Sequence, residues 1–188
     1  MDYGFFADSA GCKSHFSTHS SVLDSPRTEE FTVQGADIIE ETCKKTEYYD
    51  LCVKTLRSDP RSSNADLKGL TQITLEASLV FGRGAFIKIK KMYNETKDKG
   101  LKSCLHVCVE NYELAVVINL PGAIKLLGRN KFNDVNSYLS AAYDAPETCL
   151  DSFSEEPKTD VPPALAAWND HFEQLCTIAL DMLSNLGN

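Results

Sequence analysis

From about residue 36 to the C-terminus, apolar residues recur at spacings of three and four, and strict alternation is almost absent. This period places apolar side chains on one face of an α-helix, so we expect nearly all of this part of the chain to be helical. Two short helices are expected over residues 36–46 and 48–57, because Ser58-Asp59-Pro60 stops the second. Four longer amphipathic segments follow, at about 67–100, 101–128, 133–153 and 162–186.

Small and polar residues mark the ends and the middle of the first long segment. Asn64 or Ser63 is expected to cap its start, and Gly100 is expected to close it. Gly82 and Gly84 lie in its middle, where each is expected to weaken the helix by about 1 kcal/mol relative to Ala. The apolar stripe of this segment is typical of a helix that buries one face in a bundle.

Prolines indicate where two of the later segments bend or begin. Pro121 is expected to kink the second long segment, because proline has no backbone N–H and crowds the preceding turn. Pro162-Pro163 is expected to open the last segment, as prolines in a first turn do. Four long amphipathic segments joined by short polar loops predict an all-α fold, an up-down four-helix bundle preceded by an N-terminal α-helical hairpin.

The first thirty-five residues are rich in Ser, Thr, His and Asp and show neither helical nor strand periodicity. We therefore predict a disordered tail over residues 1–35 and one folded domain over residues 36–188. No signal peptide is recognised in residues 1–30, because no basic stretch is followed there by an apolar run. The 7 cysteines nevertheless suggest an oxidising compartment, so the alternative expectation is a true N-terminus that lies upstream and carries a signal peptide.

Charge and motifs exclude several classes of function. The chain has 27 acidic and 19 basic residues, and its net charge of −8 argues against nucleic acid as a partner. No apolar run approaches the roughly 18 residues of a membrane span, so no membrane is expected either. The sequence holds no nucleophile-elbow, zinc-protease or phosphate-loop motif, so neither enzyme activity nor a cofactor is expected. Cys12, His15 and His19 have the spacing of zinc ligands, but a closed site needs a fourth ligand and a folded frame, so no metal is expected.

Cysteine spacing restricts how the helices are joined. Cys43 and Cys52 would lie about 13 Å apart in one continuous helix, so a bridge between them needs the chain to reverse direction. A second bridge, from Cys104 or Cys108 to Cys149, would tie two long segments together and contribute about 4 kcal/mol. Spacing alone leaves both partners of Cys149 open.

The remaining cysteines have no assigned partner. Cys104 and Cys176 lie on apolar stripes and are expected to be buried thiols, with a third bridge between them as the alternative. Because 7 is odd, at least one thiol stays unpaired or links two chains, and Cys12 in the expected tail fits that role best.

Three segments of the chain contain four of its cysteines. They are Ile39-Glu40-Glu41-Thr42-Cys43 followed by Tyr49-Asp50-Leu51-Cys52, Cys108-Val109-Glu110-Asn111-Tyr112, and Leu139-Ser140-Ala141-Ala142 with Glu147-Thr148-Cys149-Leu150-Asp151. Through these segments the chain resembles the plant invertase and pectin methylesterase inhibitor family from about Ala36 to Leu186, which is about four-fifths of its length. The resemblance implies a four-helix bundle with an N-terminal helical hairpin, disulfides Cys43–Cys52 and Cys108–Cys149, and an inhibitor rather than an enzyme.

The same resemblance suggests a target. Invertase inhibitors of this family carry Pro-Lys-Phe before the segment of the fourth cysteine, where this chain has Asn130, Lys131 and Phe132. Lys and Phe are kept, which favours an acid invertase over a pectin methylesterase. Lys131 would pair with the carboxylates of a glycosidase, and Phe132 would fill a sugar subsite of the cleft. The plainer interpretation is a solvated Lys131 and a Phe132 that covers the end of the bundle.

Further expectations concern partners and location. The predicted function is one-to-one, reversible occlusion of an acid invertase (a β-fructofuranosidase). A pectin methylesterase inhibitor is the alternative, and a binding module without an enzyme target is a second alternative. The family implies the apoplast or the vacuole, and in that setting Asn94-Glu95-Thr96 is a candidate glycosylation sequon. The protein is expected to be a monomer, or a dimer that exchanges its hairpins through the short linker at residues 58–63.

Overall fold

The computed structural model describes residues 33–155 and 159–186, with side chains from Ile38 onward. Most of the expected tail, including Cys12, His15 and His19, lies outside the described residues. Helix α1 begins at Val33, and the domain boundary at residue 36 stays a prediction.

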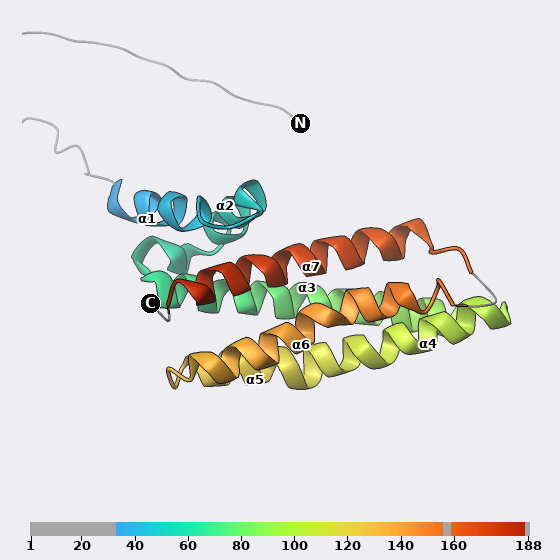
Figure 1. The fold of residues 1–188 in the computed structure, drawn as a ribbon. Helices are drawn as coiled ribbons and strands as arrows, with labels where there is room; N and C mark the ends of the chain where they lie inside the picture. The colour runs from blue at the N-terminus through green and yellow to red at the C-terminus, as the bar shows by residue number, and fades with distance from the viewer. Residues whose placement is uncertain (1–32, 156–158, 187–188) are drawn as a thin grey trace, which may run out of the picture. The chain divides into compact units, whose positions relative to one another are not determined.

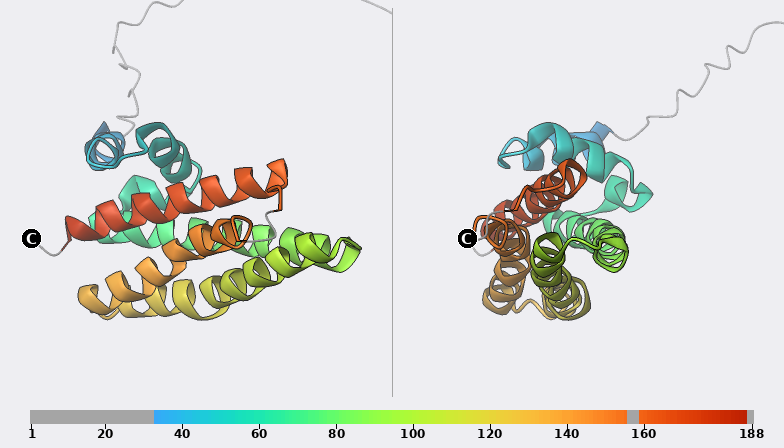
Figure 2. Two further views of the ribbon diagram at one scale, coloured as in Figure 1. Left: turned by 45° about the vertical axis from the view of Figure 1, so that its right-hand side comes forward. Right: turned by 90° about the vertical axis from the view of Figure 1, so that its right-hand side faces the viewer.

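The described chain is helical, which confirms the predicted all-α fold. A hairpin of α1 (Val33–Cys43) and α2 (Tyr49–Arg57) leads through a 3₁₀ turn, η1 (Pro60–Asn64), into α3 (Leu67–Glu95). Helix α4 (Lys99–Leu114), a π-helical turn η2 (Ala115–Asn119) and α5 (Leu120–Leu127) form the next rod, followed by α6 (Phe132–Asp151) and α7 (Pro163–Ser184). The four rods alternate in direction, and the hairpin lies beside α7 and α3 (Figures 1 and 2). This is the predicted up-down bundle preceded by a helical hairpin.

Two clusters of buried side chains hold the four rods together and attach the hairpin to them. The larger one fills the bundle and includes Tyr112, Phe153 and Phe172, each almost fully buried. The smaller one joins the hairpin to the bundle through Ile39 and Leu56, which pack with residues of α3 and α7. The hairpin is therefore attached by its own apolar patch, separate from the core of the four rods.

Helix α3 begins at the predicted residue, but its capping residue and its C-terminal end differ from the predicted ones. Ser63 and Asn64 belong to the 3₁₀ turn, and Asp66 caps the helix instead, because its Oδ1 accepts a hydrogen bond from Gly69 N at 2.8 Å. The helix ends at Glu95, and Gly100 lies in the first turn of α4. The prediction that Gly100 closes the segment was wrong, because Asp98 caps a new helix with a 2.7 Å bond from Leu101 N.

The rod of Lys99–Leu127 passes through Pro121 by way of the π-helical turn. Leu120 N–H reaches back to Ala115 O, one residue further than in an α-helix, directly before the proline. A kink was predicted at Pro121, and the structure has this wider turn directly before the proline. Among the described residues, this is the one helix long and apolar enough to cross a membrane by length and composition alone. The core helix of a bundle meets the same two criteria, and this rod supplies Tyr112 and Leu127 to the core.

Both disulfides implied by the resemblance are present. Cys43 and Cys52 have Cα atoms 5.6 Å apart across the reversal between α1 and α2. Cys108 and Cys149 have Cα atoms 4.4 Å apart and join α4 to α6. Cys104 and Cys176 are buried free thiols, as expected, and the alternative bridge between them is not formed. The Cys104 thiol instead donates a hydrogen bond to Ser152 O at 3.2 Å.

The two glycines in the middle of α3 differ in their surroundings, which helix propensity alone does not predict. A Cβ at Gly82 would meet Phe172 Cε2 at 2.6 Å and Val116 Cγ1 at 3.0 Å, whereas a Cβ at Gly84 would meet nothing within 4 Å. Gly82 therefore lets α7 and the π-helical turn approach α3 closely. At Gly84 no neighbour requires a glycine, so this residue only lowers the stability of the helix.

We expect Gly84→Ala to raise the free energy of unfolding by about 1 kcal/mol, because Ala is the better helix former. Gly82→Ala gains the same propensity but forces the buried Phe172 ring to move, so we expect a net loss of about 1 kcal/mol. Urea denaturation of the two variants beside the parent protein measures both values. Equal stabilisation by the two substitutions would contradict the close packing at Gly82.

Candidate functional site

Two of the three predicted target-binding residues, Asn130 and Lys131, lie in the tight turn between α5 and α6, residues 128–131, which we call the α5–α6 turn, and Phe132 is the first residue of α6. The backbone bonds that close the turn include Asn130 N to Leu127 O at 3.0 Å and Lys131 N to Leu126 O at 3.1 Å. Asn130 has a φ of 57°, a left-handed conformation that Asn tolerates better than most residues. Proline, whose φ is fixed near −65°, is not compatible with this conformation, so the turn is built differently from a Pro-Lys-Phe turn.

A side chain from α3 also holds this turn. Lys68 Nζ donates a hydrogen bond to Asn130 Oδ1 at 2.6 Å. Lys68 lies in the first turn of α3, so this bond links the α5–α6 turn to the neighbouring rod at the same end of the bundle. Asn130 thus contributes both the backbone conformation and an anchoring acceptor.

Lys131 and Phe132 lie side by side but differ in environment. Lys131 is exposed, forms no ion pair with any described residue, and its carbonyl oxygen accepts the first helical bond of α6, from Val135 N at 2.9 Å. Phe132 is partly buried and packs against the bundle core. Both residues help to line a surface hollow of about 390 Å³, which is formed by residues 130–134. This turn therefore presents two cations to solvent, Lys131 and Arg129, while Phe132 holds the turn to the bundle.

A second surface feature, which the sequence did not reveal, is a groove of about 500 Å³ between the hairpin and the bundle. Its lining includes Val80 and Phe81 of α3, and the ring centroids of Phe81 and His171 lie 4.4 Å apart. Burial lowers the pKa of His171, and the positive charge of Lys54 acts in the same direction. The groove thus lies over an apolar contact between α3 and α7.

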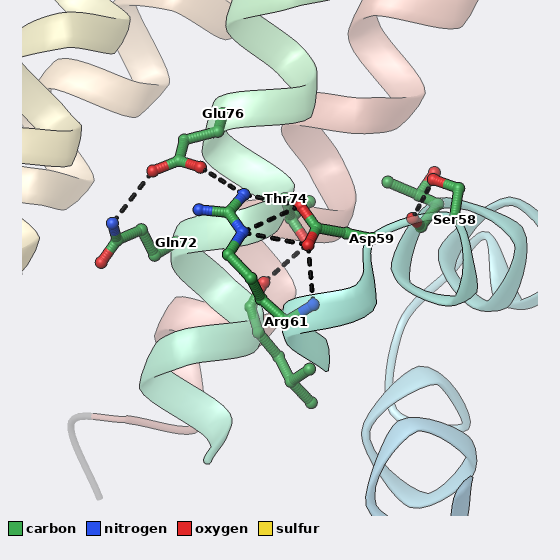
Figure 3. Close-up of polar contacts among 8 residues, drawn as sticks. Ser58, Asp59, Arg61, Gln72, Thr74 and Glu76 are labelled. Atoms are coloured by element: carbon green, nitrogen blue, oxygen red, sulfur yellow. Dashed lines mark hydrogen bonds and ion pairs between the residues drawn. The ribbon is translucent and has the colours of Figure 1, made fainter. Parts of the chain in front are cut away.

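An ion-pair network at the edge of this groove fastens the 3₁₀ turn to α3 (Figure 3). Arg61 Nη2 lies 2.6 Å from Asp59 Oδ2 and 2.7 Å from Glu76 Oε2. Gln72 Nε2 donates to the other Glu76 oxygen at 2.9 Å. Hydrogen bonds from Arg61, mainly from its side chain and also from its backbone N–H, hold the pKa of Asp59 below its ordinary value.

A separate contact lies within the hairpin. Tyr49 OH donates a hydrogen bond to Glu40 at 2.6 Å, and this bond is the largest cause of the lowered pKa of the Glu40 carboxyl.

This network predicts how hairpin docking responds to acid. Because the folded pKa of Asp59 is lowered, its contribution to stability is complete above the ordinary pKa of 3.8 and is lost as the pH falls through the folded pKa. We expect urea midpoints that are unaffected by this network from about pH 7 to about pH 5 and that fall below about pH 4. In the Asp59→Asn variant, the urea midpoint should fall less steeply below about pH 4. If the urea midpoint of the variant falls as steeply with pH as that of the parent protein, other carboxyl groups cause the loss of stability in acid.

Comparisons with known proteins agree with one another. The family model described as plant invertase/pectin methylesterase inhibitor matches residues 37–182. A pectinesterase inhibitor from Actinidia deliciosa is 36% identical over 86% of this chain and 86% of its own length. The cell wall / vacuolar inhibitor of fructosidase 2 from Arabidopsis thaliana is 32% identical over 79% of this chain and 83% of its own. A crystal structure of a mutant form of a pectin methylesterase inhibitor from Arabidopsis superposes with a TM-score of 0.64 at 27% identity, over 76% of this chain and 92% of that one.

Proposed function

Because this chain belongs to the plant invertase/pectin methylesterase inhibitor family, which consists of enzyme inhibitors rather than enzymes, we propose that its target is an acid invertase. In this proposal the α5–α6 turn enters the active-site cleft and blocks it reversibly, one inhibitor to one enzyme. Asn130 shapes the turn, Lys131 binds the enzyme and Phe132 fixes the turn to the bundle. No reaction is catalysed, so the inhibitor needs no nucleophile or general base of its own.

The observation that carries this proposal is an exposed cation on a constrained turn. Glycosidases hydrolyse with a pair of carboxyl groups that flank the scissile bond, so their clefts suit an ammonium group. Lys131 lacks an ion-pair partner among the described residues and is thus available for such a cleft. The bonds of Asn130 to Lys68 and to Leu127 order the turn before binding, which lowers the entropy lost on association.

A pectin methylesterase is the second candidate target, and a different surface supports it. Leu114, Val117 and Ile118 of the Lys99–Leu127 rod are 55%, 58% and 52% exposed. They follow one another at helical spacing around the π-helical turn, which directs them outward. An apolar helix face of this kind suits a side-on contact with a long polysaccharide-binding cleft. In that case Lys131 would contribute little.

Location and assembly are part of the same proposal. A protein that inhibits cell-wall or vacuolar enzymes meets them in the apoplast or the vacuole, where disulfides persist. We propose that a single chain suffices for inhibition, because the turn at Lys131 belongs to one chain. A dimer formed by exchange of hairpins would leave that turn exposed on each copy and would therefore inhibit as well.

Paired inhibition assays test the target. Oxidatively refolded protein is added, at about pH 5, to purified acid invertase and to purified plant pectin methylesterase. The proposal predicts inhibition of the invertase that saturates at one inhibitor per enzyme. Inhibition of the esterase alone would establish the second candidate and contradict the first. If neither enzyme is inhibited, the protein is a binding module that does not act on these targets.

A further inference from the structure

We propose that Asn94 carries an N-linked oligosaccharide, at the end of the bundle opposite the α5–α6 turn. The chain contains a single Asn-x-Ser/Thr triplet without proline, Asn94-Glu95-Thr96. Such a triplet in a protein of the secretory route is an acceptor when its Asn lies at the surface. The inference rests on the extracellular or vacuolar location put forward above, since only the secretory route supplies the transferase.

The surroundings of Asn94 fit an acceptor. Asn94 is exposed in the last turn of α3, and its amide has no hydrogen-bond partner among the described residues. The helix ends at the next residue, Glu95, because Thr96 takes an extended conformation while its N–H bonds to Met92 O. Lys90, Lys91 and Lys97, near Asn94 in sequence, are also exposed, so an attached sugar meets no buried side chain there. No packing or hydrogen bond of the fold has to be broken to accommodate it.

The modification is a group transfer that needs no redox partner. Asn94 Nδ2 forms a bond to C1 of the first N-acetylglucosamine of a polyprenyl-pyrophosphate oligosaccharide. The bond between that carbon and the pyrophosphate oxygen breaks, and the lipid pyrophosphate leaves with the electron pair. The proton from Nδ2 passes to a base of the transferase. The Thr96 hydroxyl is the recognition group of the sequon, and in the folded protein it accepts a 3.3 Å bond from Asp98 N.

The position of Asn94 keeps the sugar away from the proposed target. Lys68, at the start of α3, bonds to Asn130 and so marks the end of the bundle that holds the α5–α6 turn. From Lys68 to Asn94 the helix rises about 39 Å at about 1.5 Å per residue. Ile87, which is 66% exposed, precedes Asn94 by two turns on the same face. The oligosaccharide would therefore cover bare apolar surface on α3 without reaching the turn.

Secretion with mass analysis tests the site. The full chain is expressed behind a secretory leader in a eukaryotic host, together with a reporter glycoprotein, and weighed before and after peptide N-glycosidase. We expect the parent protein to lose the mass of one oligosaccharide and Asn94 to be converted to Asp. Asn94→Gln and Thr96→Ala should be secreted without sugar, and Thr96→Ser should keep it, because serine also provides the hydroxyl. An unmodified Asn94 in both the parent protein and Thr96→Ser, from a host that glycosylates the reporter, would overturn the proposal.

The same samples test the placement of the sugar. Glycosylated and enzymatically deglycosylated proteins should inhibit the target enzyme equally, within about twofold. A glycosylated form that is about tenfold weaker would contradict a sugar remote from the target. Because the modification is measured by mass, it is tested whether or not the proposed target is correct.

Discussion

Removing the Cys108–Cys149 bridge by the double substitution Cys108→Ala, Cys149→Ala is expected to lower the free energy of unfolding by about 4 kcal/mol. The two cysteines are 41 positions apart, and closing a loop of that length in the unfolded chain accounts for a loss of this size. The bridge also has a buried polar neighbour, because Asn169 Nδ2 donates to Cys149 Sγ at 3.5 Å and Asn169 Oδ1 accepts from Tyr112 OH at 2.7 Å. The substitution leaves that Asn169 donor without its partner, which adds to the loss.

The hairpin bridge is the matched control. Cys43 and Cys52 are only 9 positions apart, so the same reasoning gives about 2.6 kcal/mol for Cys43→Ala, Cys52→Ala. Guanidinium denaturation without reductant compares the two double variants with the parent protein. Alkylation with mass mapping confirms that Cys104 stays unpaired in each. A larger loss from the hairpin variant than from the bundle variant would contradict the loop-closure account.

Reversing the charge at Lys131 is expected to weaken inhibition of acid invertase at least about 30-fold. Losing one partner of a buried charge pair costs about 2–5 kcal/mol, and the Glu of Lys131→Glu would also face the enzyme's carboxylates. The fold should be unaffected, because Lys131 is exposed and contributes only its backbone carbonyl to α6. The inhibition constant of Lys131→Glu, measured beside its circular dichroism spectrum, gives the result.

Lys97→Glu serves as the control for net charge. Lys97 is also exposed but lies between α3 and α4, at the other end of α3 from Lys68. Its inhibition constant should stay within about twofold of the parent value. Phe132→Ala is a poorer probe, because Phe132 packs on the core and its loss changes stability as well. If the two charge reversals weaken inhibition equally, the α5–α6 turn is not the contact.

The fold could be predicted because its signals are local. Apolar residues at spacings of three and four determined the helices, and Pro163 opens α7 as expected. The start of α3 at residue 67 was predicted correctly, but its capping residue was not, because Ser63, Asn64 and Asp66 are all good capping residues. The choice among them depends on the 3₁₀ turn of Pro60–Asn64, which takes up the first two. That turn has no periodic signal of its own.

Features that depend on distant contacts were beyond the sequence. Gly82 and Gly84 are the same residue type in the same helix, and the sequence does not show that Phe172 packs against Gly82 and that nothing packs against Gly84. Arg61 and Glu76 belong to different elements, so their ion pair could not be inferred from spacing. At the candidate site, the position of Lys131 followed from the family resemblance. The left-handed φ of Asn130 and the burial of Phe132 required the structure.

Competition with substrate is the most direct test of the central claim, that the bundle occludes the target's active site. The apparent inhibition constant for acid invertase is measured at increasing sucrose concentrations, from well below to well above the KM of the enzyme. Occlusion predicts that this constant rises linearly with the sucrose concentration, as the true inhibition constant multiplied by one plus the ratio of sucrose concentration to KM, with an unchanged maximal rate at saturating sucrose. An apparent constant that stays the same at all sucrose concentrations, with a lowered maximal rate, would contradict occlusion and would indicate binding away from the active site.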